Sequence, residues 1–398
     1  MNSIVELLVV LISALSAMLI VYHHVGYPLF LKWYSKRHPL SHVSDIVRGY
    51  RGSDLDSTRP SITILVPAYN EERWIAEKIR NLASLDYPRK RLSIIIACDG
   101  CTDNTVEIAQ DTIQESICSD VHFEIRDFAE NKGKVAVINH QMKTITTDVT
   151  ALSDVSALIS IDALLVAEQH FLNESTGVLN GHYQLLSTNN EGEASYWKYQ
   201  SQLKQNEASL GSTLGAHGAF YLFRTHLFEP ICENTINDDF ILPMTIVKQG
   251  YKTLYDEKLV ALELEETNQN NDFKRRLRIS AGNMQQVTQL FSLFNPRYKG
   301  VAFAFISGKG LRLMTPYLML VCLTTSMMLM HHTLFFAALI GQLTIYSIAG
   351  LSLLFPSVFK CKLCTLITYL VSGHFANFVG GLRYLLGFES GRWTRVNH

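Results

Sequence analysis

The chain has 398 residues, 47% of them hydrophobic and 18% charged, so it is too apolar to be disordered and long enough for two or three structural units. Its 35 Lys and Arg residues balance 36 Asp and Glu residues to a formal net charge of −1, which excludes the broad positive field that non-specific nucleic-acid binding needs. We therefore expect no nucleic-acid partner, and we expect the apolar residues to gather in segments that could cross a membrane.

The first such segment begins at the N-terminus. Residues 4–20 contain a single charge, Glu6, and the apolar stretch continues beyond them, which is long enough for a helix across a hydrocarbon core about 30 Å thick. A cleaved signal peptide is disfavoured, because no basic residue precedes the segment and no small-residue cleavage site ends it. Lys32, Lys36 and Arg37 follow, and the positive-inside rule places that end in the cytoplasm.

The middle of the chain alternates predicted strands with predicted helices. Runs rich in β-branched residues predict strands at 61–66, 92–97 and 121–126, and a fourth strand is expected to end at Asp154. Turn residues and a helical pattern follow each of the first three strands. This alternation is typical of α/β proteins and predicts a mainly parallel, doubly wound sheet.

Polar, turn-forming clusters follow these strands at 67–72, 99–103 and 153–156. Ligands of such sheets bind at the carboxyl ends of the strands, so these clusters are the expected binding site. The chain has no G-x-G-x-x-G after a strand and no G-x-x-x-x-G-K-[ST], so neither a common dinucleotide site nor a P-loop is supported. The glycine-rich segment 211–223 predicts a backbone-lined pocket, and a helix is expected to begin at 237–240.

More apolar segments follow near the C-terminus. Residues 311–330 and 333–355 are each long enough to span, and they form a predicted hairpin joined at His331 and His332. Before them, residues 303–314 predict an interfacial helix that leads into the hairpin. The last apolar stretch, 363–388, carries polar groups that are costly in lipid, and it either spans or lies at the interface.

Two C-x-x-C pairs, Cys98 with Cys101 and Cys361 with Cys364, could in principle form a four-thiolate zinc site. One pair lies in the polar part of the chain and the other at a predicted membrane boundary. Reduced cysteines are therefore the favoured interpretation.

Seven short motifs occur in order along the chain: PAYNEE (67–72), CDGCTDNT (98–105), NKGK (131–134), SDVS (153–156), GAHGAFY (215–221), NDDF (237–240) and RRLRI (275–279). Together they resemble membrane-bound glycosyltransferases of family 2, in the cellulose-synthase-like and hyaluronan-synthase-like branch. The resemblance covers residues 60–300. It implies a GT-A fold, which is a Rossmann-like α/β sheet, here with N-terminal and C-terminal transmembrane helices.

The resemblance also implies an activity, the inverting transfer of a sugar from a nucleotide diphosphate donor to a hydroxyl, assisted by Mg²⁺ or Mn²⁺. A leaving diphosphate accumulates negative charge, and Mg²⁺ commonly takes only one or two carboxylates besides the phosphates. Asp154 matches the metal and diphosphate carboxylate, and Asp239 matches the general base that takes the proton of the acceptor hydroxyl. The implied donor-binding residues are Ala68, Tyr69, Glu71, Asp99, Lys134, Asp154 and Arg278. His217 and Asp238 are the implied acceptor-binding residues.

The chain departs from the family pattern at three places. Ser156 stands where the D-x-D motif has its second carboxylate. Cys98 and Cys101 replace an Asp and a Ser of the usual D-D-G-S turn. The Q-x-x-R-W motif has lost its Gln and Trp and retains only Arg275 and Arg278, so processive synthesis is left open.

We therefore expect three domains: an N-terminal transmembrane anchor at 1–34, a cytoplasmic GT-A domain at 35–300, and an interfacial helix with a C-terminal transmembrane region at 301–398. The expected protein lies in the inner (plasma) membrane and transfers sugar from a UDP-sugar to a lipid-linked or polysaccharide acceptor, with export by separate proteins. A processive polysaccharide synthase is the first alternative. A non-catalytic membrane scaffold of a glycan export complex is the second.

Overall fold

The computed structural model describes residues 3–39, 49–186, 191–265, 269–355, 358–359 and 361–389. It divides into two compact units, each treated by itself below. We call one the sheet unit, which comprises the described residues within 37–189 and 196–268. We call the other the helical unit, which comprises the described residues within 3–36, 191–195 and 269–389.

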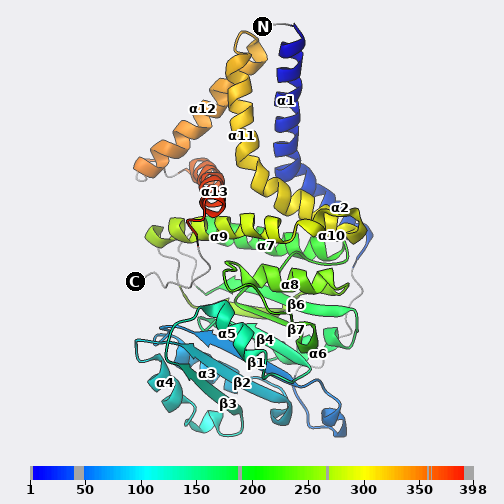
Figure 1. The fold of residues 1–398 in the computed structure, drawn as a ribbon, viewed down its shortest axis with the longest axis vertical. Helices are drawn as coiled ribbons and strands as arrows, with labels where there is room; N and C mark the ends of the chain where they lie inside the picture. Colours follow the sequence, from blue (N-terminus) through cyan, green and yellow to red (C-terminus); the bar gives the residue numbers. More distant parts are fainter. Residues whose placement is uncertain are drawn as a thin grey trace. The chain divides into compact units, whose positions relative to one another are not determined.

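The sheet unit is built on one eight-stranded sheet in the order β3-β2-β1-β4-β7-β6-β8-β5 (Figure 1). In chain order the strands are β1 (Ile62–Ala68), β2 (Leu92–Asp99), β3 (His122–Phe128), β4 (Val149–Ser153), β5 (Ala157–Ile159), β6 (Thr176–Leu185), β7 (Phe220–Arg224) and β8 (Lys252–Glu263). The pairs β3-β2, β2-β1, β1-β4 and β6-β8 are parallel. Strands β7 and β5 pair antiparallel with their neighbours, so the sheet is mixed but mostly parallel, which confirms the prediction of a mainly parallel sheet.

The register of the parallel strands explains why the predicted polar clusters meet. Ile62 of β1 pairs with Leu92 of β2 and with Val149 of β4, and Ala68 pairs with Cys98 at the other end. All residues of β1 are buried, as a central strand covered on both faces requires. The carboxyl ends of β1, β2 and β4 therefore lie side by side at one edge of the sheet.

The helices of the sheet unit return the chain between the strands. They are α3 (Ile75–Ala83), α4 (Thr105–Thr112), α5 (Lys134–Gln141), α6 (Ala163–Phe171) and α8 (Asp238–Lys248), while α7 (Glu191–Ala208) begins in the helical unit and continues into this one. In α3, Ile75, Ile79 and Leu82 are fully buried, which is the spacing of an amphipathic helix against a core. The helix predicted after each of the first three strands is therefore present, as α3, α4 and α5.

Among the described residues, the helical unit contains four helices that are long and apolar enough to cross a membrane (Figure 1). They are Ser3–Arg37, which joins α1 (Ser3–Val21) to α2 (Tyr27–Arg37) through a π-helical turn, Gly300–Met328, Thr333–Leu354 (α12) and Lys362–Leu385 (α13). The unit also contains α9 (Gln269–Gln289). The predicted hairpin is present, since α11 (Leu311–Met328) and α12 follow each other through a short turn.

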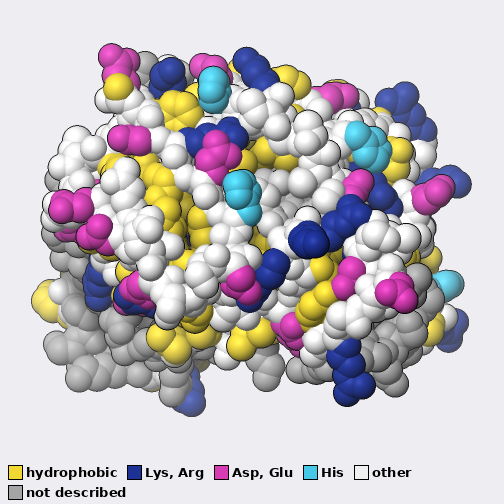
Figure 2. All heavy atoms as spheres, turned by 90° about the horizontal axis from the view of Figure 1, so that it is seen from below, with side chains coloured by type: hydrophobic (Ala, Val, Ile, Leu, Met, Phe, Trp, Pro, Cys, Tyr) yellow, Lys and Arg dark blue, Asp and Glu magenta, His cyan; other side chains and the backbone are white. Residues whose placement is uncertain are grey.

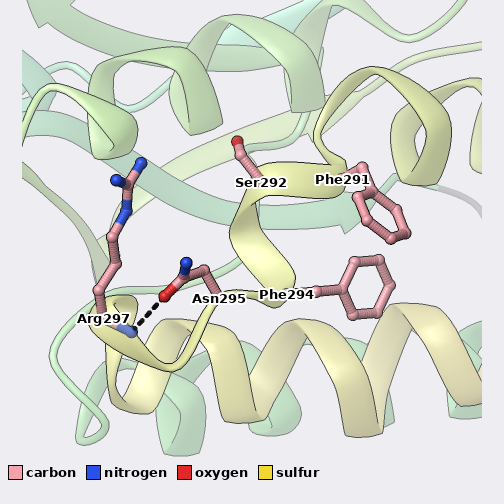
Figure 3. A pocket seen from close by; sticks show the side chains of 5 residues that line it. All are labelled: Phe291, Ser292, Phe294, Asn295 and Arg297. Carbon is pink, nitrogen blue, oxygen red and sulfur yellow. Dashed lines mark hydrogen bonds between the residues drawn. The ribbon is translucent and has the colours of Figure 1, made fainter.

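The predicted interfacial helix at 303–314 is not a separate element. The chain runs from α10 (Gly300–Ala304) through a π-helical segment, Phe305–Gly310, into α11, so the region belongs to one long apolar helix. Just before α10, a hollow of about 390 Å³ is lined by Phe291, Ser292, Phe294, Asn295 and Arg297 (Figure 3). Aromatic rings lie on one side of this hollow and polar groups on the other, where the Arg297 N–H donates to Asn295 Oδ1 at 2.9 Å.

Candidate active site

Asp99, the last residue of β2, holds the NKGK turn that lies between β3 and α5. Its side chain is fully buried and accepts two hydrogen bonds of 2.8 Å, one from the Lys132 N–H on Oδ1 and one from the Gly133 N–H on Oδ2. Gly100 has a positive φ of 63°, and a Cβ there would lie 2.3 Å from the backbone nitrogen of Asn131. The carboxylate therefore holds the NKGK turn against the end of β2, and only glycine permits the close approach of the two backbones.

The loops after β1 and β2 are joined by side-chain hydrogen bonds. Asn70 Oδ1 accepts from the Thr102 N–H at 2.8 Å, and Thr105 Oγ1 accepts from the Glu71 N–H at 2.7 Å. Asn70 has a positive φ of 54°, a conformation that Asn tolerates better than most residues. The PAYNEE and CDGCTDNT motifs thus form one connected structure at the edge of the sheet.

The two thiols in this region also interact. Cys98 is fully buried at the end of β2, and Cys101 donates to the Ala68 carbonyl at 3.6 Å. A hydrogen bond between the two side chains lowers the pKa of Cys101 to about 7 and raises the pKa of Cys98. The cysteines that replace the usual Asp and Ser are therefore a paired part of the turn.

Lys134, at the start of α5, connects this turn to the end of β4. Its ammonium lies 2.8 Å from Asp154 Oδ1 and 3.7 Å from Asp238 Oδ2. Burial lowers the pKa of Lys134, but the charges of Asp154 and Asp238 outweigh it, so the pKa lies above the usual value for lysine. The ammonium is therefore charged, and it links two carboxylates that are 84 residues apart in sequence.

Asp239 lies next to Asp238 in the first turn of α8. Its Oδ2 accepts from the Gly218 N–H at 3.1 Å. A Cβ on Gly218 would lie 3.5 Å from that oxygen and 3.4 Å from Asp154 Oδ2, so the glycine borders both carboxylates. Burial and the charge of Asp238 raise the pKa of Asp239 to about 6. A carboxyl with such a pKa can accept and release a proton near neutral pH.

His217 is held in the same loop. Its ring stacks on Tyr183 with centroids 3.9 Å apart, and its Nδ1 accepts from the Ala219 N–H at 3.2 Å. The backbone N–H of His217 donates to Asn180 Oδ1 at 3.0 Å. These contacts fix the ring beside Gly218. The loop predicted as a backbone-lined pocket thus carries His217 and contacts Asp239 directly.

The structure places most of the predicted site residues at this edge. Lys134, Asp154, Asp238 and Asp239 are brought together, whereas Ala68 is fully buried in β1 and can reach a ligand only through its backbone. Tyr69 and Glu71 are half-buried in the loop that follows. Arg278 lies on α9 in the helical unit, and its predicted part in diphosphate binding remains a prediction.

Two further side chains at this site were missed from the sequence. Glu263, at the end of β8, accepts a hydrogen bond from Ser156, the residue that stands in place of the second D-x-D carboxylate. Lys78 of α3 is fully buried and donates to Ser153 Oγ at 2.6 Å and to the Ala157 carbonyl, on either side of Asp154. A lysine on a helical face and a glutamate in a later strand carry no sequence signal that links them to Asp154.

The residues around Asp154 fit a divalent cation. Lys134 donates to Oδ1 of Asp154, while Oδ2 lies on the side of Gly218, and the Asp154 side chain is 36% exposed. Two buried polar atoms near these carboxylates, Asp238 Oδ2 and Tyr221 Oη, have no hydrogen-bond partner. A partly exposed carboxylate suits an ion such as Mg²⁺, which takes few protein ligands and fills its shell with phosphate and water oxygens.

A solved structure with a similar fold is that of the mannosyltransferase PcManGT from Pyrobaculum calidifontis, in complex with GDP-Man and Mn²⁺. The two chains superpose with a TM-score of 0.68 at 18% sequence identity, over 95% of this chain and 100% of the other. The mixed, mostly parallel sheet with long apolar helices before and after it is therefore a GT-A-like fold, the fold of nucleotide-sugar glycosyltransferases. Residues 60–282, more than half of the chain, match the family "Glycosyltransferase like family 2", and the chain belongs to that family.

Curated relatives match a smaller part of the chain. The chain is 24% identical over 229 residues to the poly-beta-1,6-N-acetyl-D-glucosamine synthase of Staphylococcus aureus, a match that covers 56% of this chain and 54% of that protein. The synthase of the same name from Staphylococcus epidermidis matches with the same identity over the same length. The chain thus spans about half the length of the curated relatives it matches.

Proposed function

We propose that this glycosyltransferase transfers a sugar from a nucleoside diphosphate donor to the hydroxyl of a membrane-associated glycan, with inversion and with Mg²⁺ or Mn²⁺. The observation that carries the proposal is the position of Gly218, which borders both Asp154 and Asp239 and has no side chain to separate the two carboxylates. A donor diphosphate at Asp154 and an acceptor hydroxyl at Asp239 would then meet across a space that has no side chain from residue 218.

Asp239 acts as the general base in this proposal. Its Oδ2 is held by the Gly218 N–H, so we assign Oδ1 to take the proton of the acceptor hydroxyl as that oxygen attacks the sugar. Burial and the neighbouring Asp238 raise the pKa of Asp239 to about 6, which suits a base that must also release its proton. Attack from the side opposite the diphosphate inverts the configuration of the sugar.

Asp154 and Lys134 bind the donor diphosphate. A divalent ion held by Asp154 Oδ2 would supply positive charge to the leaving group. Lys134 neutralises Asp154 and Asp238, so an anionic donor can approach a site that otherwise holds several carboxylates. We further propose that the loops at 67–72 and 98–105, which are joined through Asn70 and Thr105, bind the nucleoside. We also propose that Arg278 binds the diphosphate.

The product is proposed to be a polysaccharide or a lipid-linked glycan. The staphylococcal synthases that the chain resembles make a polymer of N-acetylglucosamine, which favours a UDP-sugar donor. The structural neighbour was solved with GDP-Man, so guanosine donors belong in any test. The four long apolar helices support a membrane location, and we propose that the sheet unit lies on the cytoplasmic side of the plasma membrane, with export by separate proteins.

The first test is the release of nucleoside diphosphate by the purified full chain in detergent with native lipid extract, across a panel of UDP-sugars and GDP-Man. We expect release with one donor, and we expect its loss on chelation of divalent ions and in Asp239→Asn. Asp111→Asn is the matched control, because Asp111 is an exposed carboxylate on α4. Release that survives Asp239→Asn would move the base elsewhere. No release with any donor would favour the non-catalytic scaffold, and a long product would favour the processive synthase.

A further inference from the structure

A second group of ligand-type side chains lies in the helical unit. Glu6 of α1 approaches His331 and His332 of the turn between α11 and α12, at the upper end of these helices in Figure 1. Glu6 Oε1 lies 2.6 Å from His332 Nε2 and 3.1 Å from His331 Nε2, and the three ligand atoms lie within 4.8 Å of one another. Within the described part of the chain, no other group of three His, Cys, Asp or Glu side chains comes so close.

The position of Glu6 requires an explanation. It is the one charged side chain between residues 3 and 31, in a helix whose neighbouring Ile4, Leu7 and Leu8 are exposed and apolar. An ionised carboxylate in such a helix is costly unless it is paired or serves a function. Here two imidazoles from a turn more than 300 residues away in sequence meet the same carboxylate oxygen.

Two imidazole nitrogens and one carboxylate oxygen are a donor set that Zn²⁺ uses in sites with an open fourth position. The two rings have centroids 4.2 Å apart, and both direct Nε2 to Glu6. The side chains of His331 and His332 are 55% and 49% exposed, so water can reach a fourth position. Imidazole favours ions such as Zn²⁺ or Co²⁺ over Mg²⁺, which prefers oxygen.

We propose that Glu6, His331 and His332 bind a divalent transition-metal ion of the Zn²⁺ type, which ties the N-terminal helix to the turn between α11 and α12. The ion would bridge elements that are distant in sequence and neutralise the single carboxylate of α1. This site uses no residue of the proposed active site and does not rest on the proposed function. The alternative is that two histidine–carboxylate hydrogen bonds suffice without a metal.

The experiment uses Co²⁺ as a spectroscopic probe on the full chain, purified in detergent without a histidine tag and stripped with a chelator. Excess Mg²⁺ occupies oxygen-only sites. We expect one Co²⁺ per chain, with visible d–d absorption of a four-coordinate site and without the thiolate charge-transfer band that cysteine ligands would give. Zn²⁺ should displace it and raise the midpoint of thermal unfolding.

Glu6→Gln and His331→Asn should each weaken Co²⁺ binding by about 100-fold, since even the loss of a partner outside the ligand set commonly costs 10–100-fold. His331→Asn keeps the shorter Glu6–His332 hydrogen bond, so its fold should persist. His226→Asn, at an exposed histidine of the sheet unit, is the matched control and should bind Co²⁺ like the wild type. The proposal is overturned if the wild type binds no Co²⁺, if binding is unchanged in both variants, or if the bound ion shows thiolate ligation.

Discussion

Asp99→Asn tests whether this carboxylate stabilises the turn that carries Lys134. The two oxygens of Asp99 accept from the Lys132 and Gly133 N–H groups at 2.8 Å, and the side chain is fully buried. An Asn side chain offers one oxygen and one NH₂, so one backbone N–H would face another donor. Hydrogen bonds to a charged partner contribute about 1.5–3 kcal/mol each, so we expect the variant to lose about 2 kcal/mol of stability.

For a domain of this size, a loss of about 2 kcal/mol lowers the midpoint of thermal unfolding by about 4–8 °C. The measurement is thermal unfolding in detergent, combined with hydrogen exchange of the amides of Lys132 and Gly133, which should become faster in Asp99→Asn. Asp111→Asn is the control, because Asp111 is exposed on α4 and should leave both quantities unchanged. If Asp99→Asn keeps the wild-type midpoint and exchange rates but binds donor more weakly, the carboxylate recognises the nucleotide and the turn does not depend on it.

Two other substitutions test the site through different physical effects. Gly218→Ala should lower donor turnover by about 100-fold without loss of stability, because the new methyl group would lie 3.4 Å from Asp154 Oδ2 and 3.5 Å from Asp239 Oδ2. Gly52→Ala is the control. A Cβ at residue 52 meets no atom closer than 4.0 Å, so turnover should be unchanged. Burial lowers the pKa of Lys78 from 10.5 to about 7. Between pH 7 and pH 10.5 the unfolded chain therefore binds more protons than the folded chain. The free energy of unfolding should rise with pH in this range, by up to about 1.4 kcal/mol per pH unit. Lys78→Met should remove this rise in unfolding midpoints measured from pH 7 to 10, and equal slopes in both proteins would contradict the assignment.

The sequence predicts the parallel half of the sheet well because its strands and helices follow one another directly along the chain. Turn residues directly follow each of the strands β1, β2 and β3. The carboxyl ends that form the site could therefore be located from the spacing of apolar residues and the composition alone. The pairing of the antiparallel strand β7 between β4 and β6 depends on contacts with residues far away in sequence, so no local pattern predicts it. Strand β7, together with the antiparallel pairing of β5 and β8, makes the sheet mixed.

The charge pattern of the surface follows from the composition. On the face shown in Figure 2, basic and acidic side chains are interspersed, as the formal net charge of −1 suggests. The partners of single charged groups do not follow from composition. Lys78 follows Glu77 in sequence and Glu6 lies among apolar residues, and only the structure shows that Lys78 donates to Ser153 and that Glu6 meets two histidines.

The replacement of the second D-x-D carboxylate by Ser156 is the departure that the structure does most to explain. The Ser156 carbonyl accepts from the Leu264 N–H at 2.9 Å, and its side chain donates to Glu263, whose pKa is raised by burial. The antiparallel pairing of β5 with β8 fixes this contact, since Ala157 and Glu263 are partners in the register. A carboxylate is therefore present beside Asp154, but it comes from β8. A sequence motif contains only residues that are close together in the chain, whereas the chemistry of a site depends on which side chains the sheet brings to one edge.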